Sequence, residues 1–431
     1  MKANPKKFYL ALVIFSLVGQ VAWVVENMYL NVFIYKMFNA SAEAISAMVA
    51  ASAVAATVTT IFVGALSDKL GKRKIFICLG YILWGISIWS FALIHMDVIN
   101  ALFPSVASAA AVGVSLVIIM DCVMTFFGSS ANDACFNAWL TDSTDASNRG
   151  KVEGINAMMP LVAILVVFGS FMSFDQNLPE TWTWIFGIIG SVVLVLGVAG
   201  FFLVEETPIH TEENQNYFKN ILYGFRPGVI CSNPKLYLAL LAYGVFGIAI
   251  NIFMPYLILY YSVSLGMENY VLIFAPAIVL AAVFTAIYGR VYDRRGFKAA
   301  VLPALGLLMA GFAVLYFCKD TALVFIGSLL MMCGYLSGMA VFGAVLRDHT
   351  PENKAGMFQG QRIVGQVLIP GIIGPAIGAA VLKNAETILN EDGTTSFIPN
   401  ENIFLAAFVA ACVIFLVLIP LFGKMKEDRR G

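Results

Sequence analysis

Few ionisable side chains interrupt the long apolar runs of this sequence, and these few offer the most chemistry. Asp133 lies nine residues before the end of its run, about 13 Å along a helix, and Glu26 lies in the far half of the first run. Arg362 lies about two helical turns into a later run, with Gln359 and Gln366 on its face. An ionisable group at mid-membrane costs roughly 2.5–3.5 kcal/mol, so each is expected to have a partner, water or a function.

Other polar side chains in these runs could contact a bound solute or cation. Trp23, three residues before Glu26, could stack on the face of a sugar ring. The remaining candidates carry amide or hydroxyl groups: Asn27, Asn132, Asn251, Tyr256 and Tyr260. The alternative for Asp133 is a purely structural role, bracing helices through Asn132 or a neighbouring hydroxyl. Asp121, some 30 Å by helical rise from the end of the run that holds Asp133, is expected at the outer surface.

The composition explains what positions these groups. Of 431 residues, 60% are hydrophobic and only 12% are charged, half of the share usual in soluble globules. Apolar runs long enough to span a bilayer as helices recur along the whole chain. We expect twelve of them, near 8–36, 42–67, 73–95, 112–141, 150–174, 181–204, 235–263, 270–290, 298–317, 321–346, 355–382 and 402–423.

Lysine and arginine indicate the orientation of these spans. One side would hold both termini and the loops at 68–74, 142–151, 205–235, 290–298 and 347–354, which together carry nearly all of the basic residues. The other side has only Lys36, Lys319 and Lys383. Positive loops stay inside, so both termini are predicted to be cytoplasmic.

One long polar connection, 205–234, lies midway along the chain and divides two similar halves, 1–204 and 235–431. FYLAL with Gly19 matches LYLAL with Gly247, an offset of 228 residues, whereas 141–156 matches 347–362 at an offset of 206. The difference places an insertion in the first half, expected in the outer segment 96–111. The repeat pairs Glu26 with Met254 and Asp133 with Met339, so these acids are confined to the first half.

A short loop motif between two runs also occurs twice. GALSDKLGKRK, from Gly64 to Lys74, is matched by GRVYDRRGFK, from Gly289 to Lys298, at an offset of 225 residues. The basic residues of such a hairpin place it on the cytoplasmic side of the membrane. We expect these two loops and the next loop of each half to form gates, with the candidate gate residues Gly64, Asp68, Arg73, Asp142, Arg149, Gly289, Asp293, Arg294 and Asp348.

The doubled loop resembles the signature of the major facilitator superfamily, and the resemblance covers nearly the whole chain. It implies an all-α integral membrane fold, with twelve transmembrane helices in two six-helix pseudo-symmetric halves. It also implies that Arg73 meets Asp142 at the end of the fourth helix, and that Asp293, Arg294 and Asp348 repeat this contact. Such pairs bias which way a central cavity faces.

A narrower resemblance begins at Asp133. The run from Asp133 through Phe136 to Thr144 is similar to helix 4 of the glycoside–pentoside–hexuronide cation symporters, the melibiose permease group. This resemblance implies that Asp133 contacts substrate, cation or both, and that Arg362 takes the place of a basic residue on helix 11. Sodium-coupled members carry acids deep in helix 2, where this chain has only Glu43 at the outer end, so a proton is the favoured coupling ion.

The leading hypothesis is therefore a multi-pass plasma-membrane transporter that works by alternating access. It would carry a small polar solute, such as a glycoside or sugar acid, together with a proton or another cation. The alternative is a proton-driven exporter of amphipathic molecules, which the content of 18 Met and 34 Phe keeps open.

No nucleophile–base pair or metal-binding motif suggests an enzyme or a cofactor. The zero net charge gives no support for a nucleic-acid partner. The lipid bilayer and the solute are the expected partners of a functional monomer.

Overall fold

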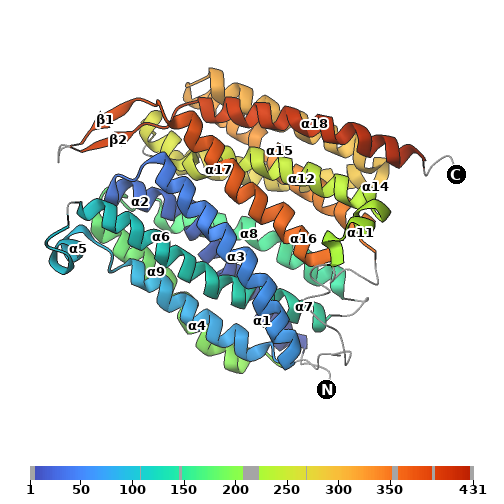
Figure 1. The fold of residues 1–431 in the computed structure, drawn as a ribbon, viewed down its shortest axis with the longest axis horizontal. Helices are drawn as coiled ribbons and strands as arrows, with labels where there is room; N and C mark the ends of the chain where they lie inside the picture. The colour runs from blue at the N-terminus through green and yellow to red at the C-terminus, as the bar shows by residue number, and fades with distance from the viewer. Residues whose placement is uncertain are drawn as a thin grey trace. The chain divides into compact units, whose positions relative to one another are not determined.

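The computed structural model consists almost entirely of long helices (Figure 1). It describes residues 5–106, 108–144, 148–206, 223–267, 269–351, 358–390 and 394–427. Among these residues, eleven helices are long and apolar enough to cross a membrane. One of them, α14 (Tyr270–Phe317), has 48 residues, but Gly296 breaks it with φ 77° and ψ 179°. Because α14 thus supplies two spans, the twelve predicted spans are present, and the protein is a multi-pass membrane protein whose spans are all helical.

The chain divides into two compact units, Met1–Gln215 and Asn216–Gly431. The boundary lies inside the polar connection 205–234, of which 207–222 is outside the described residues. A short helix, α11 (Pro227–Ser232), occupies the end of this connection, and none of its residues is buried. The middle of the connection, where the sequence favours a short amphipathic helix along the membrane face, falls outside the described residues.

The first unit begins with a span that a π-helical turn, Val25–Tyr29, divides into two helices. A longer π-helical stretch, Ser129–Phe136, interrupts its fourth span. The insertion expected at 96–111 contains a short helix, α5. The helices of this unit are α1 (Pro5–Val24), α2 (Leu30–Phe38), α3 (Ala42–Leu70), α4 (Lys74–Phe91), α5 (Met96–Leu102), α6 (Ala109–Gly128), α7 (Asn137–Asp142), α8 (Arg149–Phe171) and α9 (Pro179–Leu203).

The second unit contains the longest helix and the only strands of the described residues. Besides α11 and α14, its helices are α12 (Pro234–Phe253), α13 (Leu257–Leu259), α15 (Thr321–His349), α16 (Gln359–Ile363), α17 (Ile369–Leu382) and α18 (Asn402–Glu427). Between α17 and α18, β1 (Thr387–Leu389) pairs antiparallel with β2 (Thr395–Phe397). This hairpin was not expected, although an Asp-Gly pair between two short β-prone runs is a hairpin signal.

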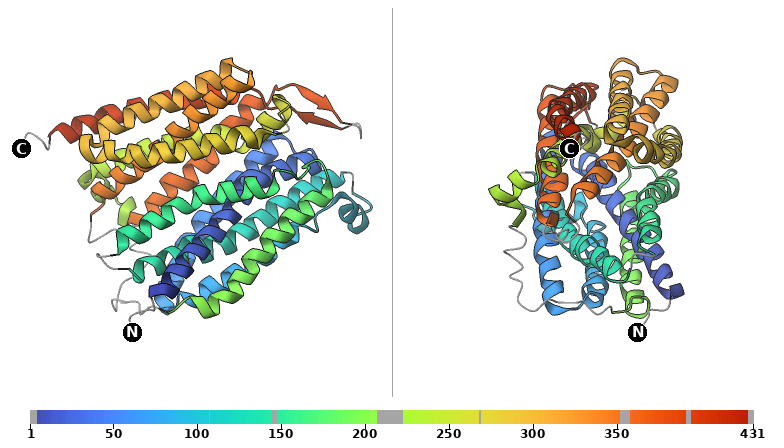
Figure 2. Two further views of the ribbon diagram at one scale, coloured as in Figure 1. Left: turned by 180° about the vertical axis from the view of Figure 1, so that it is seen from behind. Right: turned by 90° about the vertical axis from the view of Figure 1, so that its right-hand side faces the viewer.

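Small residues let the helices of the first unit approach closely. Helices α4 and α9 run side by side (Figure 2). A Cβ on Gly190 would lie 2.8 Å from the Gly85 oxygen and 2.9 Å from the Trp89 nitrogen. Such backbone contact is typical of membrane helices, where packing replaces the hydrophobic effect as the force between helices.

All four π-helical turns of the described residues contain predicted site residues. Glu26 and Asn27 lie in the first, Asn132 and Asp133 in the second, and Tyr260 and Gln366 in Tyr260–Ser264 and Val364–Leu368. A π-helical turn adds a residue to the helical turn and frees backbone groups, and such turns occur frequently at functional sites. The sequence pattern had predicted these residues on uninterrupted helices.

Candidate functional site

Glu26 forms the centre of a buried polar cluster in the first unit. Its side chain is 6% exposed. Its Oε1 accepts hydrogen bonds from Ser52 Oγ of α3 at 2.7 Å and from Thr125 Oγ1 of α6 at 2.9 Å. The two hydroxyl oxygens are 2.8 Å from each other. Three spans therefore meet at one carboxyl oxygen, while Glu26 Oε2 has no hydrogen-bond partner among the described residues.

Asp121 belongs to the same cluster, so its expected place at the outer surface is wrong. It lies one turn before Thr125, is 2% exposed and interacts electrostatically with Glu26. The expectation rested only on the distance of Asp121 from the C-terminal end of a 34-residue span, Ala109–Asp142. Counted from Ala109, Asp121 lies about 18 Å inside the helix. Its Oδ1 is buried without a hydrogen-bond partner in the described part of the chain.

A polar line connects Asp121 with Asp133 along the fourth span. Asp121, Thr125, Ser129 and Asp133 recur every four residues, which places them along one helical face. Ser129 Oγ donates to Asp133 Oδ2 at 2.9 Å. The line thus has a carboxyl at each end and two hydroxyls between, in a span that is otherwise mostly apolar. Ser52, Thr125 and Ser129 were not singled out from the sequence, because isolated hydroxyls are common in membrane helices.

Asn132 is part of the helix packing. Its Nδ2 donates to Tyr81 OH at 2.6 Å, and Tyr81 OH donates to the Phe15 carbonyl at 2.9 Å. Asn132 is 3% exposed, and a Cβ on Gly19 would collide with it. This chain of bonds joins three spans. Asn132 therefore has the bracing geometry that was the alternative considered for Asp133.

Trp23 and Asn27 lie near Glu26 along the chain, but they contact other groups. The Trp23 ring lies 4.9 Å from the Trp84 ring, centroid to centroid. Asn27 is exposed, and its Nδ2 donates to the Trp23 carbonyl at 2.8 Å. Neither side chain is bonded to the Glu26 carboxyl.

In the second unit, three predicted site residues are bonded to backbone carbonyls. Tyr256 is fully buried and Tyr260 is 1% exposed; their hydroxyls donate to Pro375 and Leu315. The half-buried Asn251 donates to the Gly247 carbonyl at 2.9 Å. These tyrosines belong to the core of the unit, because the turns immediately before and after α13, Met254–Tyr256 and Tyr260–Ser264, are buried at both positions.

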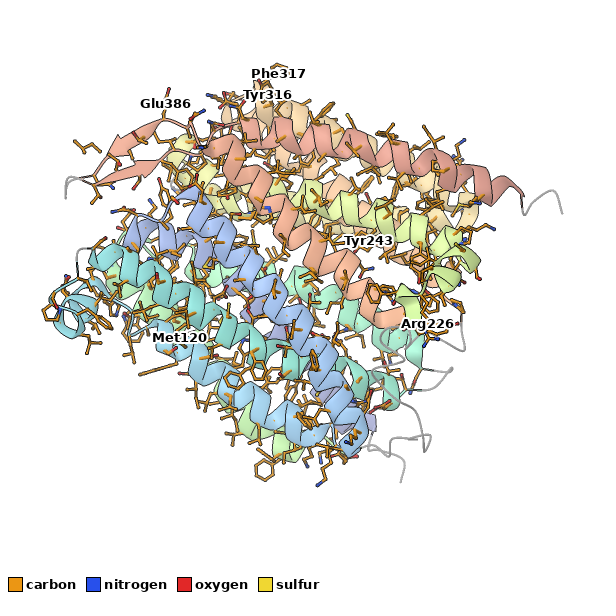
Figure 3. The ribbon with its side chains drawn as sticks, viewed as in Figure 1. Met120, Arg226, Tyr243, Tyr316, Phe317 and Glu386 are labelled. Carbon is orange, nitrogen blue, oxygen red and sulfur yellow. The ribbon has the colours of Figure 1, made fainter. Side chains whose placement is uncertain are left out.

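Arg362 and Gln366 differ from these residues because each has a donor left over. Arg362 Nε and Gln366 Nε2 are buried without a hydrogen-bond partner among the described residues. Arg362 lies close enough to Tyr243 of α12 to interact with it electrostatically, and Figure 3 labels Tyr243. The side chains of Gln359 and Arg149 lie outside the described part of the chain.

The predicted contact between Arg73 and Asp142 is present. Arg73 Nε lies 3.1 Å from Asp142 Oδ2, and the same guanidinium contacts Asp68 and Ser67. Burial works to lower the pKa of Arg73, but the two carboxylates outweigh it and raise the pKa above its usual value. Gly71, with φ 65°, ends α3 and turns the chain toward Arg73.

Among the described residues the second loop shows no counterpart of this ion pair, so the implied contact of Asp293 and Arg294 with Asp348 is not present there. Arg294 and Asp293 are exposed, and Asp348 instead accepts a hydrogen bond from Tyr292. The reason is in the alignment: the counterpart of Arg73 is Lys298, which lies over the Phe422 ring, 5.4 Å from its centroid. The counterpart of Ser67 is Tyr292, whose longer side chain reaches Asp348 directly. Gly296, like Gly71, has a positive φ.

Twelve spans, with buried polar groups inside apolar helices, define a polytopic membrane protein. The chain belongs to the Major Facilitator Superfamily, whose family model matches residues 9–375, and it is a secondary transporter, not an enzyme. A search of curated proteins found no match.

Several solved structures share the fold. A point mutant of the nucleoside transporter NupG superposes with a TM-score of 0.72 at 13% identity, covering 96% of this chain and 99% of that one. A D-xylose-proton symporter gives 0.72 at 14% identity, covering 95% and 97%. A bacterial homolog of the human lysosomal transporter Spinster gives 0.68 at 13%, covering 98% of each chain. At these identities, the similarity concerns the fold.

Proposed function

We propose that the protein carries a small polar solute together with a proton, with Glu26 as the main proton-binding group. The observation that supports this best is the hydrogen count around Glu26. Three oxygens, Glu26 Oε1, Ser52 Oγ and Thr125 Oγ1, form a triangle with edges of 2.7, 2.9 and 2.8 Å. A hydrogen bond along each edge requires three hydrogens, and the two hydroxyls supply only two. A proton on the Glu26 carboxyl would supply the third.

The polar line along the fourth span offers such a proton a way to Asp133. Hydroxyls can accept and donate a proton in turn, and Thr125 and Ser129 lie between the two ends of the line. The resemblance to the melibiose permease group implies that Asp133 also contacts the solute. Binding of the solute near Asp133 would then depend on where the proton is, which couples the two movements. A proton needs only these carboxyls, whereas sodium needs several oxygen ligands together.

The second unit would contribute donors to the solute. Arg362 and Gln366 have buried nitrogen atoms without a partner among the described residues. Unpaired buried donors cost free energy, which a hydroxyl or carboxylate of a solute would recover. A glycoside or sugar acid supplies such acceptors, and the xylose and nucleoside carriers of similar fold transport molecules with sugar rings. The basic loops favour cytoplasmic termini in the plasma membrane.

The test is solute-driven proton movement in proteoliposomes with an internal pH dye. Candidate glycosides, sugar acids, pentoses and nucleosides would be added outside to wild type, Asp133→Asn and the control Glu43→Gln, an exposed acid of α3. We expect the dye to report internal acidification with one solute class in wild type and the control, and the loss of this signal in Asp133→Asn. Proton-free solute exchange that is equal in all three proteins would contradict the proposal.

A second candidate, proton-driven export of amphipathic molecules, is favoured by one cavity. A space of about 550 Å³ lies between α3 and α6, and its lining is apolar, including Val54, Val58 and Phe126. Ala51 and Cys122 in this lining are the chain neighbours of Ser52 and Asp121. An exporter would show proton efflux driven by lipophilic cations or dyes, with no response to any sugar-like solute.

A further inference from the structure

The polar connection between the two halves of the chain ends in a turn that packs onto helices of the second unit. This turn, Tyr223–Phe225, is a short 3-10 turn in which Gly224 is buried. Tyr237 OH of α12 donates a hydrogen bond to the Gly224 carbonyl. The Phe358 ring, which is 1% exposed, lies 6.0 Å from the Tyr223 ring and 6.5 Å from the Tyr237 ring, centroid to centroid. The end of the connection is thus fixed to α12 and to the residue that precedes α16.

Gln361 of α16 packs directly against Gly224. The Gln361 side chain is 4% exposed, and its Nε2 donates to Tyr237 OH at 3.4 Å. A Cβ on Gly224 would overlap the amide group of Gln361. Because Gln361 is almost completely enclosed, its side chain can make room for a larger residue only by giving up this contact. The contact between the turn and α16 therefore requires glycine at position 224.

The helix that this turn contacts is short and joined to its own span by an irregular turn. Helix α16 has five residues, Gln359–Ile363, and the π-helical turn Val364–Leu368 separates it from α17. Among the described elements outside its own span, α16 contacts the Tyr223–Phe225 turn most. Helices bend readily at π-helical turns, because the regular hydrogen bonds are interrupted there. Release of the turn would therefore leave α16 free to move about Val364–Leu368.

The hydrogen bonds of this contact are incomplete, which favours a contact that opens. Tyr237 has one hydroxyl hydrogen, and the Gly224 carbonyl accepts it. Gln361 Oε1 is buried without a hydrogen-bond partner among the described residues. A buried acceptor without a donor opposes the closed arrangement, and water would satisfy it once the turn is released.

We propose that the Tyr223–Phe225 turn is a strap that holds α16 in place and, on release, lets α16 move about the π-helical turn together with Arg362. Arg362 directly follows Gln361, so the strap sets where the guanidinium lies. The link to transport rests on the proposed role of Arg362 toward the solute. The strap itself depends only on contacts within the second unit.

The test is hydrogen–deuterium exchange, measured by mass spectrometry, on the full-length protein in lipid nanodiscs without solute. Gly224→Ala is compared with Gly228→Ala of α11, in which the added methyl group would have no atom within 4 Å. Loss of a buried hydrogen bond with its packing shifts an opening equilibrium about tenfold, so the amides of 359–368 should exchange about tenfold faster in Gly224→Ala. Gly228→Ala should match wild type, and peptides of α18 should exchange equally in all three proteins.

Gln361→Ala shows whether the strap acts through this side chain. Removal of the Gln361 amide makes room for a methyl group at position 224. Gly224→Ala should therefore add no further exchange of 359–368 when it is combined with Gln361→Ala. Additive effects of the two changes would contradict a strap that holds α16 through Gln361.

Equal exchange of 359–368 in Gly224→Ala and Gly228→Ala would overturn the proposal. Faster exchange throughout the second unit would also overturn it, because Gly224 would then serve general packing. If Gly224→Ala does not fold, Tyr237→Phe replaces it, since this change removes the hydroxyl that bonds Gly224 and Gln361 and adds no volume. The same local increase in exchange is expected, and its absence would overturn the strap. No solute is present, so failure of the strap is distinguishable from failure of the transport proposal.

Discussion

The buried polar side chains of the first unit fall into two groups. In one group the polar atoms are hydrogen-bonded, and in the other a buried oxygen or nitrogen has no hydrogen-bond partner among the described residues. Asn132 donates to Tyr81, which in turn reaches the Phe15 carbonyl, and this arrangement holds helices together. Glu26 and Asp121 each keep a buried oxygen without a partner among the described residues. Because unpaired buried oxygens lower stability, we infer that these two acids are retained for proton transport.

Asp121→Asn tests this distinction. The change keeps the shape of the side chain and removes the titratable group. Asp121 forms no hydrogen bond in the described structure, so the free energy of unfolding should change by less than about 1 kcal/mol. Solute uptake driven by a pH gradient should fall at least about tenfold, since proton transfer loses a positioned group.

The control for this variant is Asp97→Asn, an exposed acid of α5. Uptake and thermal unfolding would be measured on both proteins in parallel. Unchanged uptake in Asp121→Asn, or a large loss of stability without a loss of coupling, would assign Asp121 to packing.

At the scale of elements, the two signature loops share a backbone and differ in chemistry. Both turn at a glycine with positive φ, Gly71 and Gly296. The first loop ties helix ends through a guanidinium between two carboxylates, whereas the second uses the neutral hydroxyl of Tyr292. Glu206 strengthens the first by accepting from the Arg73 amide at 2.6 Å, at the start of α4. The pseudo-symmetry of the fold therefore does not extend to the forces at its loops.

Arg73→Ala and Lys298→Ala should differ for this reason. Arg73 is 5% exposed, and its removal leaves Asp68 and Asp142 without their shared cation. These carboxylates are 33% and 25% exposed, so water recovers part of the loss, and we expect about 1–3 kcal/mol lower stability. Loss of the exposed Lys298–Phe422 contact should cost less than about 1 kcal/mol. Apparent unfolding temperatures of the two variants in detergent would measure this difference in stability. Equal decreases in the two variants would argue against an asymmetric pair of loops.

The contact between α4 and α9 gives a second prediction at this scale. A Cβ at Gly190 would meet backbone atoms at 2.8 and 2.9 Å, so Gly190→Ala must push the helices apart and should cost about 1–3 kcal/mol. A Cβ added at Gly187, three residues earlier on α9, would have no atom within 4 Å. Gly187→Ala should therefore be neutral or slightly stabilising. Thermal unfolding of the pair measures the difference directly. Equal stability changes in the two variants would contradict the claim that backbone contact at Gly190 limits how closely α4 and α9 approach.

At the scale of the whole molecule, features that depend on one stretch of chain were predictable. Hydropathy gave the spans, including the two within α14. The Arg73–Asp142 contact joins two stretches of chain and was expected only because the resemblance to the major facilitator superfamily implied it. Features that depend on how helices meet were not: nothing in the sequence tells that Ser52 and Thr125 touch one carboxyl. Asp121 was misplaced because its depth was estimated only from the C-terminal end of a helix that is longer than the membrane is thick. Its distance from the N-terminal end, at Ala109, shows that it lies inside the membrane. Tyr256 and Tyr260 were chosen for their polarity, but the packing of their unit buries them.

The central claim is that the proton travels on Glu26, and Glu26→Gln in proteoliposomes tests it most directly. Glutamine keeps the hydrogen bonds of the triangle but cannot release a proton. With the solute found in the screen, we predict that radiolabelled solute still exchanges across the membrane, while solute-driven proton movement is lost. Proton movement at the wild-type ratio to solute in Glu26→Gln would contradict the claim.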